Sequence, residues 1–487
     1  MSERMGLTSV QRVVGFLIAG SSVMMLPPVL VSMWYKDGTV TLFLLSAVIL
    51  LLVGGLIFLP VRRIKQDLRL RDGFLIVVTS WLALVLVGAV PFVLLQSPEL
   101  SYVDAVFESM SGLTTTGATI ITHIDSLPRA VLYYRQQLQW LGGMGIIVLA
   151  VAILPMLRIG GMQLYRAETP GPMKDHKLTP RITETAKALW LIYVGITVIC
   201  IFAYWLGGMK LFDAVGHAFS TVAIGGFSTH DDSLAFWDNP TLEIVAVIFM
   251  TIAGINFSLH FTAWRRASAQ PYFLDPELRA YISLLFAFVV LASLSLYLTG
   301  TYDSLALSFR YGSFQVISAM TTTGFTTASF HTWPGFIPVL LICIAFIGGC
   351  AGSTAGGMKV YRIILLYRQS IREFRRLIHP HAIIPVKIGG QKISDTIISA
   401  VWGFFFLYIA SFVVMTILLT ATGLDAETAY SAVGACITNL GPALGQAGPN
   451  YASLNDTAKI ILSIAMLLGR LEIYTLLVIL TPSFWRD

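Results

Sequence analysis

Long runs of apolar residues recur along the whole chain and set the tightest limit on its fold. Residues 43–58, for example, read FLLSAVILLLVGGLIF without one charged side chain. A helix needs about 20 mostly apolar residues to cross a bilayer, and the chain contains many such stretches. Only 12% of its 487 residues are charged, whereas soluble proteins carry about 25%. The sequence therefore predicts an all-α polytopic membrane protein embedded in the lipid bilayer.

Basic residues gather in short loops between the apolar runs, which is the pattern of cytoplasmic loops in membrane proteins. They lie around residues 62–71, 158–181, 265–266 and 368–387. Because the net charge of +6 follows the expected topology, it does not indicate nucleic-acid binding, and we expect no such partner. Taking these loops as cytoplasmic predicts a multi-pass protein of the bacterial cytoplasmic (inner) membrane with both termini in the cytoplasm.

This assignment orders the chain into two N-terminal spans and four later pairs of spans. The first two lie near 13–34 and 40–60, and the pairs lie near 73–95 and 129–157, 185–206 and 240–264, 279–299 and 335–367, and 395–421 and 457–481. The period of the pairs is too long for a stacked repeat and suits four fused copies around one axis. We therefore expect a two-helix extension at 1–66 and four pseudo-symmetric helix–pore loop–helix repeats around a central pore, at 67–165, 166–272, 273–380 and 381–487.

Between the two spans of every pair lies a semi-apolar stretch followed by a polar segment centred on glycine. These segments, here called glycine segments one to four, read TTTGAT (114–119), AIGGFS (223–228), TTTGFT (321–326) and TNLGPA (438–443), and they align on Gly117, Gly226, Gly324 and Gly441. One such segment is typical of a turn capped by threonine. Four copies, each between two spans on the same side, favour a shared function.

A re-entrant hairpin explains these segments. Non-helical backbone at membrane depth is tolerated only where it is buried in protein or lines a water-filled cavity. Short helices expected near 103–113, 211–221, 308–319 and 427–437 would aim their negative C-terminal ends at one point. Threonine hydroxyls and carbonyls offer oxygen there, and glycine lets carbonyls turn inward. Because a ring of carbonyls can replace the hydration shell of a cation, the segments predict a selectivity filter for a monovalent cation, with outer carboxylates attracting that ion.

The four-repeat pattern resembles the superfamily of bacterial Trk and Ktr and plant HKT potassium transport proteins, and within it the membrane subunit of Trk uptake systems. The resemblance covers essentially the whole chain. It implies K⁺ as the transported ion with no organic cofactor, a homodimer with one pore per protomer, and a cytoplasmic TrkA-like regulatory ring that binds nucleotide (NAD, ATP or ADP) and gates the pore. It assigns the K⁺ filter to Thr115, Thr116, Gly117, Ile224, Gly225, Gly226, Thr322, Thr323, Gly324, Thr438, Asn439, Leu440 and Gly441.

The four segments differ from one another, and none reads TVGYG as in simple potassium channels. Segments two and four diverge most from the others. We therefore expect K⁺ to permeate with weaker rejection of Na⁺, and Rb⁺ to pass. Glycine at the central position of all four segments argues against the sodium-preferring members of the superfamily, some of which carry serine in the first.

The second span of repeat three contains five glycines between residues 348 and 357, and each costs a helix about 1 kcal/mol relative to alanine. Close packing of helices is one reading, because the glycines fit small-xxx-small spacing. A phosphate-binding loop is excluded because Met358 stands where that motif needs lysine. We favour an unwound segment beneath the filter, and the resemblance implies that it is an intramembrane gate formed by Gly348, Gly349, Gly352, Ser353, Thr354, Gly356, Gly357 and Lys359.

Arg470 and Glu472 interrupt the apolar last span, LLGRLEIYTLLVIL. Charges inside a span are costly and mark functional candidates. Arg470 either pairs with an acid or carbonyl of a neighbouring helix or acts as a fixed positive charge that slows cations in the pore. The resemblance, which includes an arginine there, favours the second role.

Other functional classes fit the sequence less well. An organic-solute transporter usually shows two inverted repeats, and the chain shows four parallel ones. A cation-coupled symporter (K⁺/H⁺ or K⁺/Na⁺) with the same filter remains an alternative. We expect no enzyme, since the eight histidines form no HExxH motif and no nucleophile–base constellation is evident. The basic stretches 166–181 and 371–387 fit either a docking surface for the regulatory ring or loops that face lipid.

Overall fold

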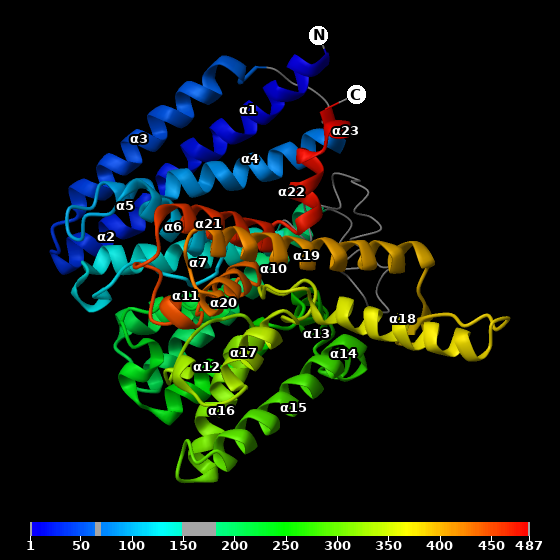
Figure 1. Cartoon of the computed structure of the whole chain (residues 1–487). Coiled ribbons are helices and arrows are strands. Elements are labelled where there is room, and N and C mark those ends of the chain that lie inside the picture. The colour runs from blue at the N-terminus through cyan, green and yellow to red at the C-terminus, as the bar shows by residue number, and fades with distance from the viewer. Residues whose placement is uncertain (1, 64–69, 149–181, 486–487) are drawn as a thin grey trace.

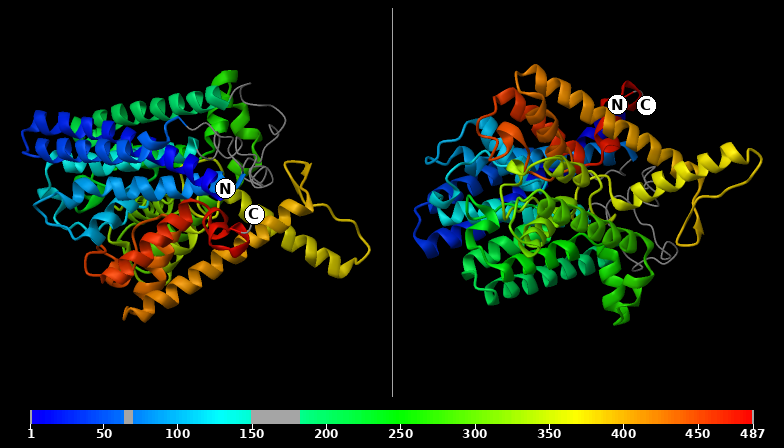
Figure 2. Two further views of the ribbon diagram at one scale, coloured as in Figure 1. Left: turned by 90° about the horizontal axis from the view of Figure 1, so that it is seen from above. Right: turned by 60° about the horizontal axis from the view of Figure 1, so that its bottom comes forward.

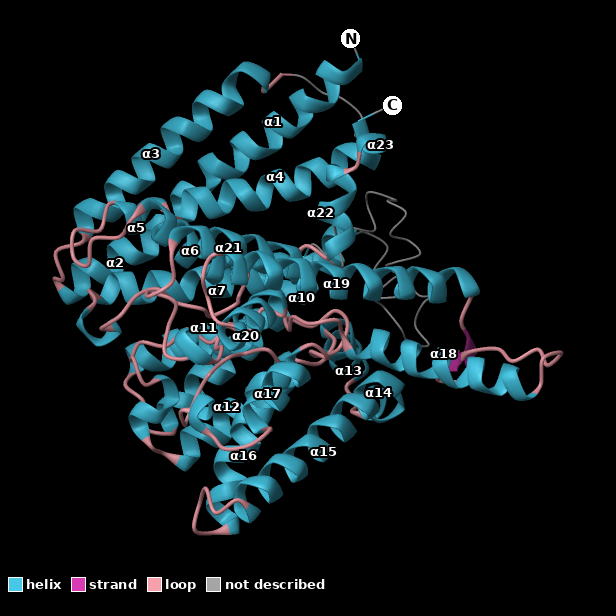
Figure 3. Ribbon diagram, in the orientation of Figure 1, coloured by secondary structure: helices cyan, strands magenta, loops and turns pink. Residues whose placement is uncertain are grey.

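Helices make up most of the residues that the structure describes. The computed structural model describes residues 2–63, 70–148 and 182–485, and in these ranges the only strands are a two-stranded hairpin, β1 (Lys387–Ile388) with β2 (Gln391–Lys392) (Figure 3). Six described helices are long and apolar enough to cross a membrane, or up to eight if each of two bent pairs is one span. The all-α polytopic fold predicted from the sequence is confirmed.

The N-terminal extension lies along one edge of the molecule (Figure 1). It consists of α1 (Ser2–Ser21), α2 (Leu26–Tyr35) and α3 (Val40–Phe58), with the short 3₁₀ turns η1 (Ser22–Met25) and η2 (Leu59–Val61). Gly54 of α3 lies so close to the backbone of Ala19 in α1 that no Cβ fits between them. The start of α1 and the last helix, α23 (Pro482–Trp485), lie near each other (Figure 2).

Each of the four repeats contains a first span, a short helix and a second span. The first spans are α4 (Leu70–Gly88, with α5, Val90–Val93), α10 (Ile182–Leu206), α15 (Pro276–Leu298) and α19 (Asp395–Ala421). The short helices, close to the expected positions, are α6 (Tyr102–Leu113), α11 (Leu211–Ala223), α16 (Leu305–Met320) and α20 (Ala426–Ile437). Ser101, Ser304 and Asp425 cap three of them by accepting a hydrogen bond from a backbone N–H of the first turn.

At the expected positions of the second spans lie α7 (Arg129–Val148), α12 (Pro240–Ala253) with α13 (Phe257–Arg266), α17 (Ile337–Ala345) with α18 (Val360–Ile378), and α21 (Asp456–Arg470) with α22 (Ile473–Leu480). Among the described residues of this set, the two bent pairs, α12 with α13 and α21 with α22, are long and apolar enough to cross a membrane. α14 (Gln270–Leu274) links α13 to the third repeat, and η3 (Ile124–Ser126), η5 (Ser233–Trp237), η6 (Phe330–Thr332) and η7 (Gly445–Ala447) lie in the returns from the glycine segments. The expected end of the span 129–157, the basic stretch 166–181 and the boundary at 166 lie outside the described residues.

Helices are present at two of the expected second spans, 240–264 and 457–481, but each is bent sharply instead of running as one helix. α12 and α13 meet at 92°, and α21 and α22 meet at 115°. In the first case Asn256 starts a new helix, because its side chain accepts a hydrogen bond from the N–H of Ser258. In the second, Glu472 has a positive φ of 56°, which no helix accommodates. The break expected in repeat three is present, since no helix covers residues 346–359.

A buried ion pair joins the first short helix to the span that follows it. Nε of Arg135 on α7 donates to Glu108 of α6 at 2.8 Å, and both side chains are at most 1% exposed. The other Glu108 oxygen accepts the N–H of Ile120, just beyond glycine segment one. A second guanidinium nitrogen of Arg135 reaches the hydroxyl of Thr119 at 3.1 Å. The ion pair therefore holds in place the backbone that follows the central glycine of segment one.

Removing the charge of Glu108 is expected to destabilise the fold strongly. Glu108→Gln leaves the Arg135 charge buried without a counter-charge, and loss of one partner of a buried pair costs about 3–5 kcal/mol. The measurement is the thermal unfolding midpoint of the purified protein in detergent. Asp395→Asn is the control, because Asp395 pairs with Arg372 at the surface and its side chain is 78% exposed. Equal shifts for the two variants would contradict the role given to the buried pair.

Candidate functional site

The four short helices end in the same way, and the glycine segments that follow them have the same backbone conformation. Two residues before each central glycine, the backbone is left-handed, with φ of 52° at Thr115, 56° at Ile224, 61° at Thr322 and 58° at Asn439. The next N–H donates back into the helix, as from Thr116 to Ser111 and from Leu440 to Ala435. This is a Schellman ending. Left-handed β-branched residues cost about 1–3 kcal/mol each and persist only where the surroundings enforce them.

The four central glycines close a ring. Each has a positive φ, 83° at Gly117, 77° at Gly226, 84° at Gly324 and 92° at Gly441. A Cβ on any of them would lie closer than 3.0 Å to a carbonyl oxygen of the next segment, a distance that real Cβ atoms essentially never show. Gly117 lies against the carbonyl of Gly225, and Gly226 against that of Thr323. Gly324 lies against the carbonyl of Leu440, and Gly441 against that of Thr116. The segments therefore follow one another in sequence order around a single axis, with four equivalent carbonyls at one level.

Several threonine hydroxyls of the segments form hydrogen bonds within their own segment or its helix. Those of Thr114, Thr321 and Thr438 each donate to the carbonyl four residues earlier, at 2.7–2.8 Å. Thr114 also bonds to Thr116 and Thr321 to Thr323, both at 2.7 Å between hydroxyl oxygens. These hydroxyls are therefore engaged in hydrogen bonds within the protein. The geometry leaves the backbone carbonyls as the common oxygen set of the ring.

The glycine-rich loop, residues 348–359, lies against the helix-end side of the ring. The N–H of Gly357 donates to the carbonyl of Thr438 at 3.1 Å, and the N–H of Gly356 donates to the hydroxyl of Thr322 at 2.7 Å. The hydroxyl of Thr354 donates to the carbonyl of Val222 in α11 at 3.0 Å. Residues at the helix ends that lead into glycine segments two, three and four therefore contact this loop.

Both flanks of the loop are anchored to neighbouring spans. The N–H of Cys350 donates to the carbonyl of Gly254 at 2.9 Å, at the break between α12 and α13. Glu277, at the start of α15 and 1% exposed, accepts the N–H of Ala351 at 2.7 Å and that of Tyr361 at 3.1 Å. Sequence reasoning missed Glu277. Its signal, an acid just after a proline at the start of a span, is also the ordinary signature of a helix N-terminus.

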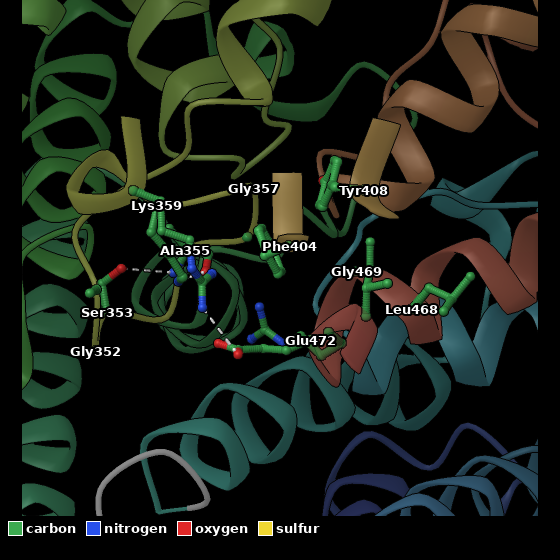
Figure 4. A pocket seen from close by; sticks show the side chains of 15 residues that line it. Gly352, Ser353, Ala355, Gly357, Lys359, Phe404, Tyr408, Leu468, Gly469 and Glu472 are labelled. Atoms are coloured by element: carbon green, nitrogen blue, oxygen red, sulfur yellow. Dashed lines mark hydrogen bonds and ion pairs between the residues drawn. The ribbon is translucent and has the colours of Figure 1, made fainter. Parts of the chain in front are cut away.

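A cavity lies beneath the loop and is lined on its other side by the break between α21 and α22 (Figure 4). Arg470 is 7% exposed and donates to the carbonyl of Thr354 at 3.0 Å. Its Nε and Nη2 have no hydrogen-bond partner among the described residues. Glu472 pairs instead with Arg362 at 3.1 Å, and Lys359 donates to the carbonyl of Ala355. Three cations and one acid therefore border the cavity, with Arg470 directly behind the loop.

Several acids of the outer connections are already paired. Lys459 binds Asp104 at 2.6 Å, and Arg310 binds both Glu243 and Asp238. Partial burial acts to raise the pKa of Asp125, but hydrogen bonds from His230 and from the N–H of Asp231 outweigh it and lower that pKa. Fewer outer carboxylates are therefore free to attract cations than their number in the sequence indicates.

Known proteins of one family are similar to this chain over nearly its whole length. The family model TrkH, described as a cation transport protein, matches residues 41–486. The Trk system potassium uptake protein TrkH of Halomonas elongata is 54% identical over 99% of this chain and 100% of the relative. The corresponding TrkG of Escherichia coli is 41% identical over 97% of each.

The crystal structure of the potassium transporter TrkH from Vibrio parahaemolyticus superposes with a TM-score of 0.92 at 49% identity, covering 99% of this chain and 100% of that one. The family resemblance noted in the sequence is thereby confirmed. With these matches, the chain belongs to the TrkH family of cation transport proteins.

Proposed function

We propose that the chain mediates potassium uptake across the bacterial cytoplasmic membrane through a pore whose selectivity filter is the ring of the four glycine segments. The observation that carries this proposal is the ring itself, in which each central glycine lies against a carbonyl of the next segment. Carbonyl rings of this kind replace the hydration shell of K⁺. The relatives named as potassium uptake proteins support the choice of ion.

The short helices add to the attraction. α6, α11, α16 and α20 all end at the ring, and a helix C-terminus carries about half a negative charge. This field favours any monovalent cation. Discrimination therefore rests on the geometry of the carbonyls, and because the four segments differ in sequence, Rb⁺ passes readily and Na⁺ is rejected incompletely.

The glycine-rich loop is the proposed gate. It occupies the inner ends of glycine segments three and four through Gly356 and Gly357, so an ion leaving the ring inward meets backbone N–H groups rather than oxygen. Arg470 lies behind the loop and donates to Thr354. In this proposal its charge, buried among apolar and backbone groups, slows cations that have passed the loop.

Regulation enters from the cytoplasmic side. The proposed assembly is a homodimer with a TrkA-like nucleotide-binding ring below it. α18, which continues directly from the gate, and the β1–β2 hairpin stand away from the bundle (Figures 1 and 2). In the stretch 371–387 the apolar side chains of Phe374, Leu377 and Ile383 are exposed. This surface fits a protein partner, and contact with lipid is the competing role.

Changing the first central glycine to serine is expected to weaken ion discrimination. In Gly117→Ser the new Cβ displaces the carbonyl of Gly225, so the preference for Rb⁺ over Na⁺ should fall about tenfold, equivalent to about 1.4 kcal/mol. The measurement is isotopic Rb⁺ and Na⁺ uptake into proteoliposomes under an imposed voltage. Gly55→Ser is the control, because a Cβ there meets nothing within 4 Å. An unchanged preference in Gly117→Ser contradicts the filter role. If uptake by the parent protein needs a proton or Na⁺ gradient in addition to voltage, the result favours a symporter.

Displacing the loop is expected to raise flux. In Gly356→Ala the Cβ would overlap the carbonyl of Thr438, which pushes the loop away from the ring, and deletion of residues 353–357 removes the residues that contact segments three and four. Both variants should take up Rb⁺ faster than the parent protein in the absence of the regulatory ring and nucleotide. Gly195→Ala, at an open position on α10, serves as the neutral control. Unaltered uptake in both loop variants rules out a gate at this place.

Removing the Arg470 charge is expected to increase conduction. Arg470→Ala takes away a buried positive charge next to the pore, where repulsion of cations is weakly screened, while Arg470→Lys keeps the charge and should stay near the parent value. Single-channel conductance in planar bilayers is the measurement. A conductance of Arg470→Ala at or below that of the parent protein contradicts the electrostatic role.

A further inference from the structure

Glycine segment two lacks the internal support that segments one and three possess. In those two, the threonine just before the central glycine bonds to the threonine two residues earlier, Thr116 to Thr114 and Thr323 to Thr321. The equivalent positions of segment two are Gly225 and Ala223, which have no hydroxyl. Segment two nevertheless adopts the same backbone conformation and takes the same place in the ring. Its support must therefore come from elsewhere.

Gln139 of α7 supplies that support. Its side-chain Nε2 donates to the carbonyl of Gly225 at 2.5 Å, and its Oε1 accepts the N–H of Phe227 at 3.0 Å. The two bonds lie on either side of the central Gly226. A Cβ on Gly225 would lie within 3.0 Å of three atoms of this carboxamide. The carboxamide of Gln139 therefore fills the space that a threonine side chain occupies in segments one and three.

Two neighbours on the same helix continue the contact along the segment. Nε2 of Gln136 donates to the carbonyl of Phe227 at 3.3 Å, and Arg135 donates to the carbonyl of Ser228 at 3.2 Å. Positions 135, 136 and 139 share a helix face through i,i+3 and i,i+4 spacing, and all three side chains are at most 1% exposed. Gln137 points elsewhere and donates to the carbonyl of Met24 in the N-terminal extension.

We propose that Gln139 is a specificity-determining positioning residue of the pore, assisted by Gln136 and Arg135. The inference rests on the proposed function. The carbonyl of Gly225 lies in the ring, against Gly117. The hydrogen bond that Gln139 donates to this carbonyl oxygen fixes the direction of the carbonyl and occupies one of the two lone pairs of the oxygen. The Gly225 carbonyl oxygen of segment two therefore binds a cation more weakly, and is held more rigidly, than the carbonyl oxygens of the other segments. The choice among K⁺, Rb⁺ and Na⁺ thus depends on a side chain outside the glycine segments.

The test compares two replacements of Gln139 with a matched control on the same helix. Gln139→Leu removes both hydrogen bonds, and Gln139→Glu keeps the acceptor for Phe227 but cannot donate to Gly225. Each should lower the ratio of Rb⁺ to Na⁺ uptake into proteoliposomes by about fivefold or more, as expected for a hydrogen bond of about 1 kcal/mol. Gln137→Leu should leave the ratio unchanged. Gel filtration and the thermal midpoint establish that each variant is folded.

A rescue separates specificity from general support of the fold. Restoring the missing pair in segment two, with Ala223→Thr and Gly225→Thr in the background of Gln139→Ala, should recover the ratio, because the hydroxyls of segments one and three are then reproduced. If the ratio is unchanged in folded Gln139→Leu and Gln139→Glu, the proposal is overturned. It is also overturned if these variants lose folding and uptake together without rescue, which assigns Gln139 a structural role only. Absence of Rb⁺ uptake by the parent protein would instead refute the proposed function itself.

Discussion

The close approach of four glycine Cα atoms to four carbonyl oxygens is the contact on which the rest of the structure depends. It brings non-helical backbone from all four repeats to one axis at membrane depth, where every N–H and C=O must find a partner within the protein. The Schellman endings satisfy the first N–H groups of each segment, and the hydroxyls of Thr114, Thr321 and Thr438 bond to the last turns of their helices. Side chains at any central position would force the ring apart.

Chemically different devices support the four segments from behind. Segments one and three use pairs of threonines, segment two uses the carboxamide of Gln139, and segment four uses Asn439, whose Nδ2 donates to the hydroxyl of Thr116 and to the carbonyl of Met466, both at 3.0 Å. The backbone pattern is therefore four-fold while the side chains that maintain it are not. Fused repeats permit this arrangement, because each copy is free to change its support as long as its carbonyl stays in the ring.

The architecture could be predicted from the sequence because its signals are repeated. Charge-free runs indicate where the spans lie, and the alignment on Gly117, Gly226, Gly324 and Gly441 indicates which residues form the ring. The breaks at 254–256 and 471–472 could not be predicted, because each depends on one or two residues within an apolar run. Left-handed Thr115, Ile224 and Thr322 contradict local preference and are imposed by packing between repeats. The partners of Glu277 and Arg470 are backbone groups, which leave no mark in the sequence.

The same reasoning indicates which part of the glycine-rich loop is free to move in the proposed gate. Its flanks are tied to Gly254 and to the Glu277 carboxylate, which holds Ala351 and Tyr361 together. Its middle is held to the helix ends near the ring by hydrogen bonds of Thr354, Gly356 and Gly357. In the proposed gate, clearing the axis would break these hydrogen bonds, together with those that Thr354 makes with Ala253 and Arg470, while both flanks stay in place. Because Arg470 donates to Thr354, a loop that moves also changes the environment of that charge, and in the proposed gate one displacement would relieve both the obstruction and the repulsion.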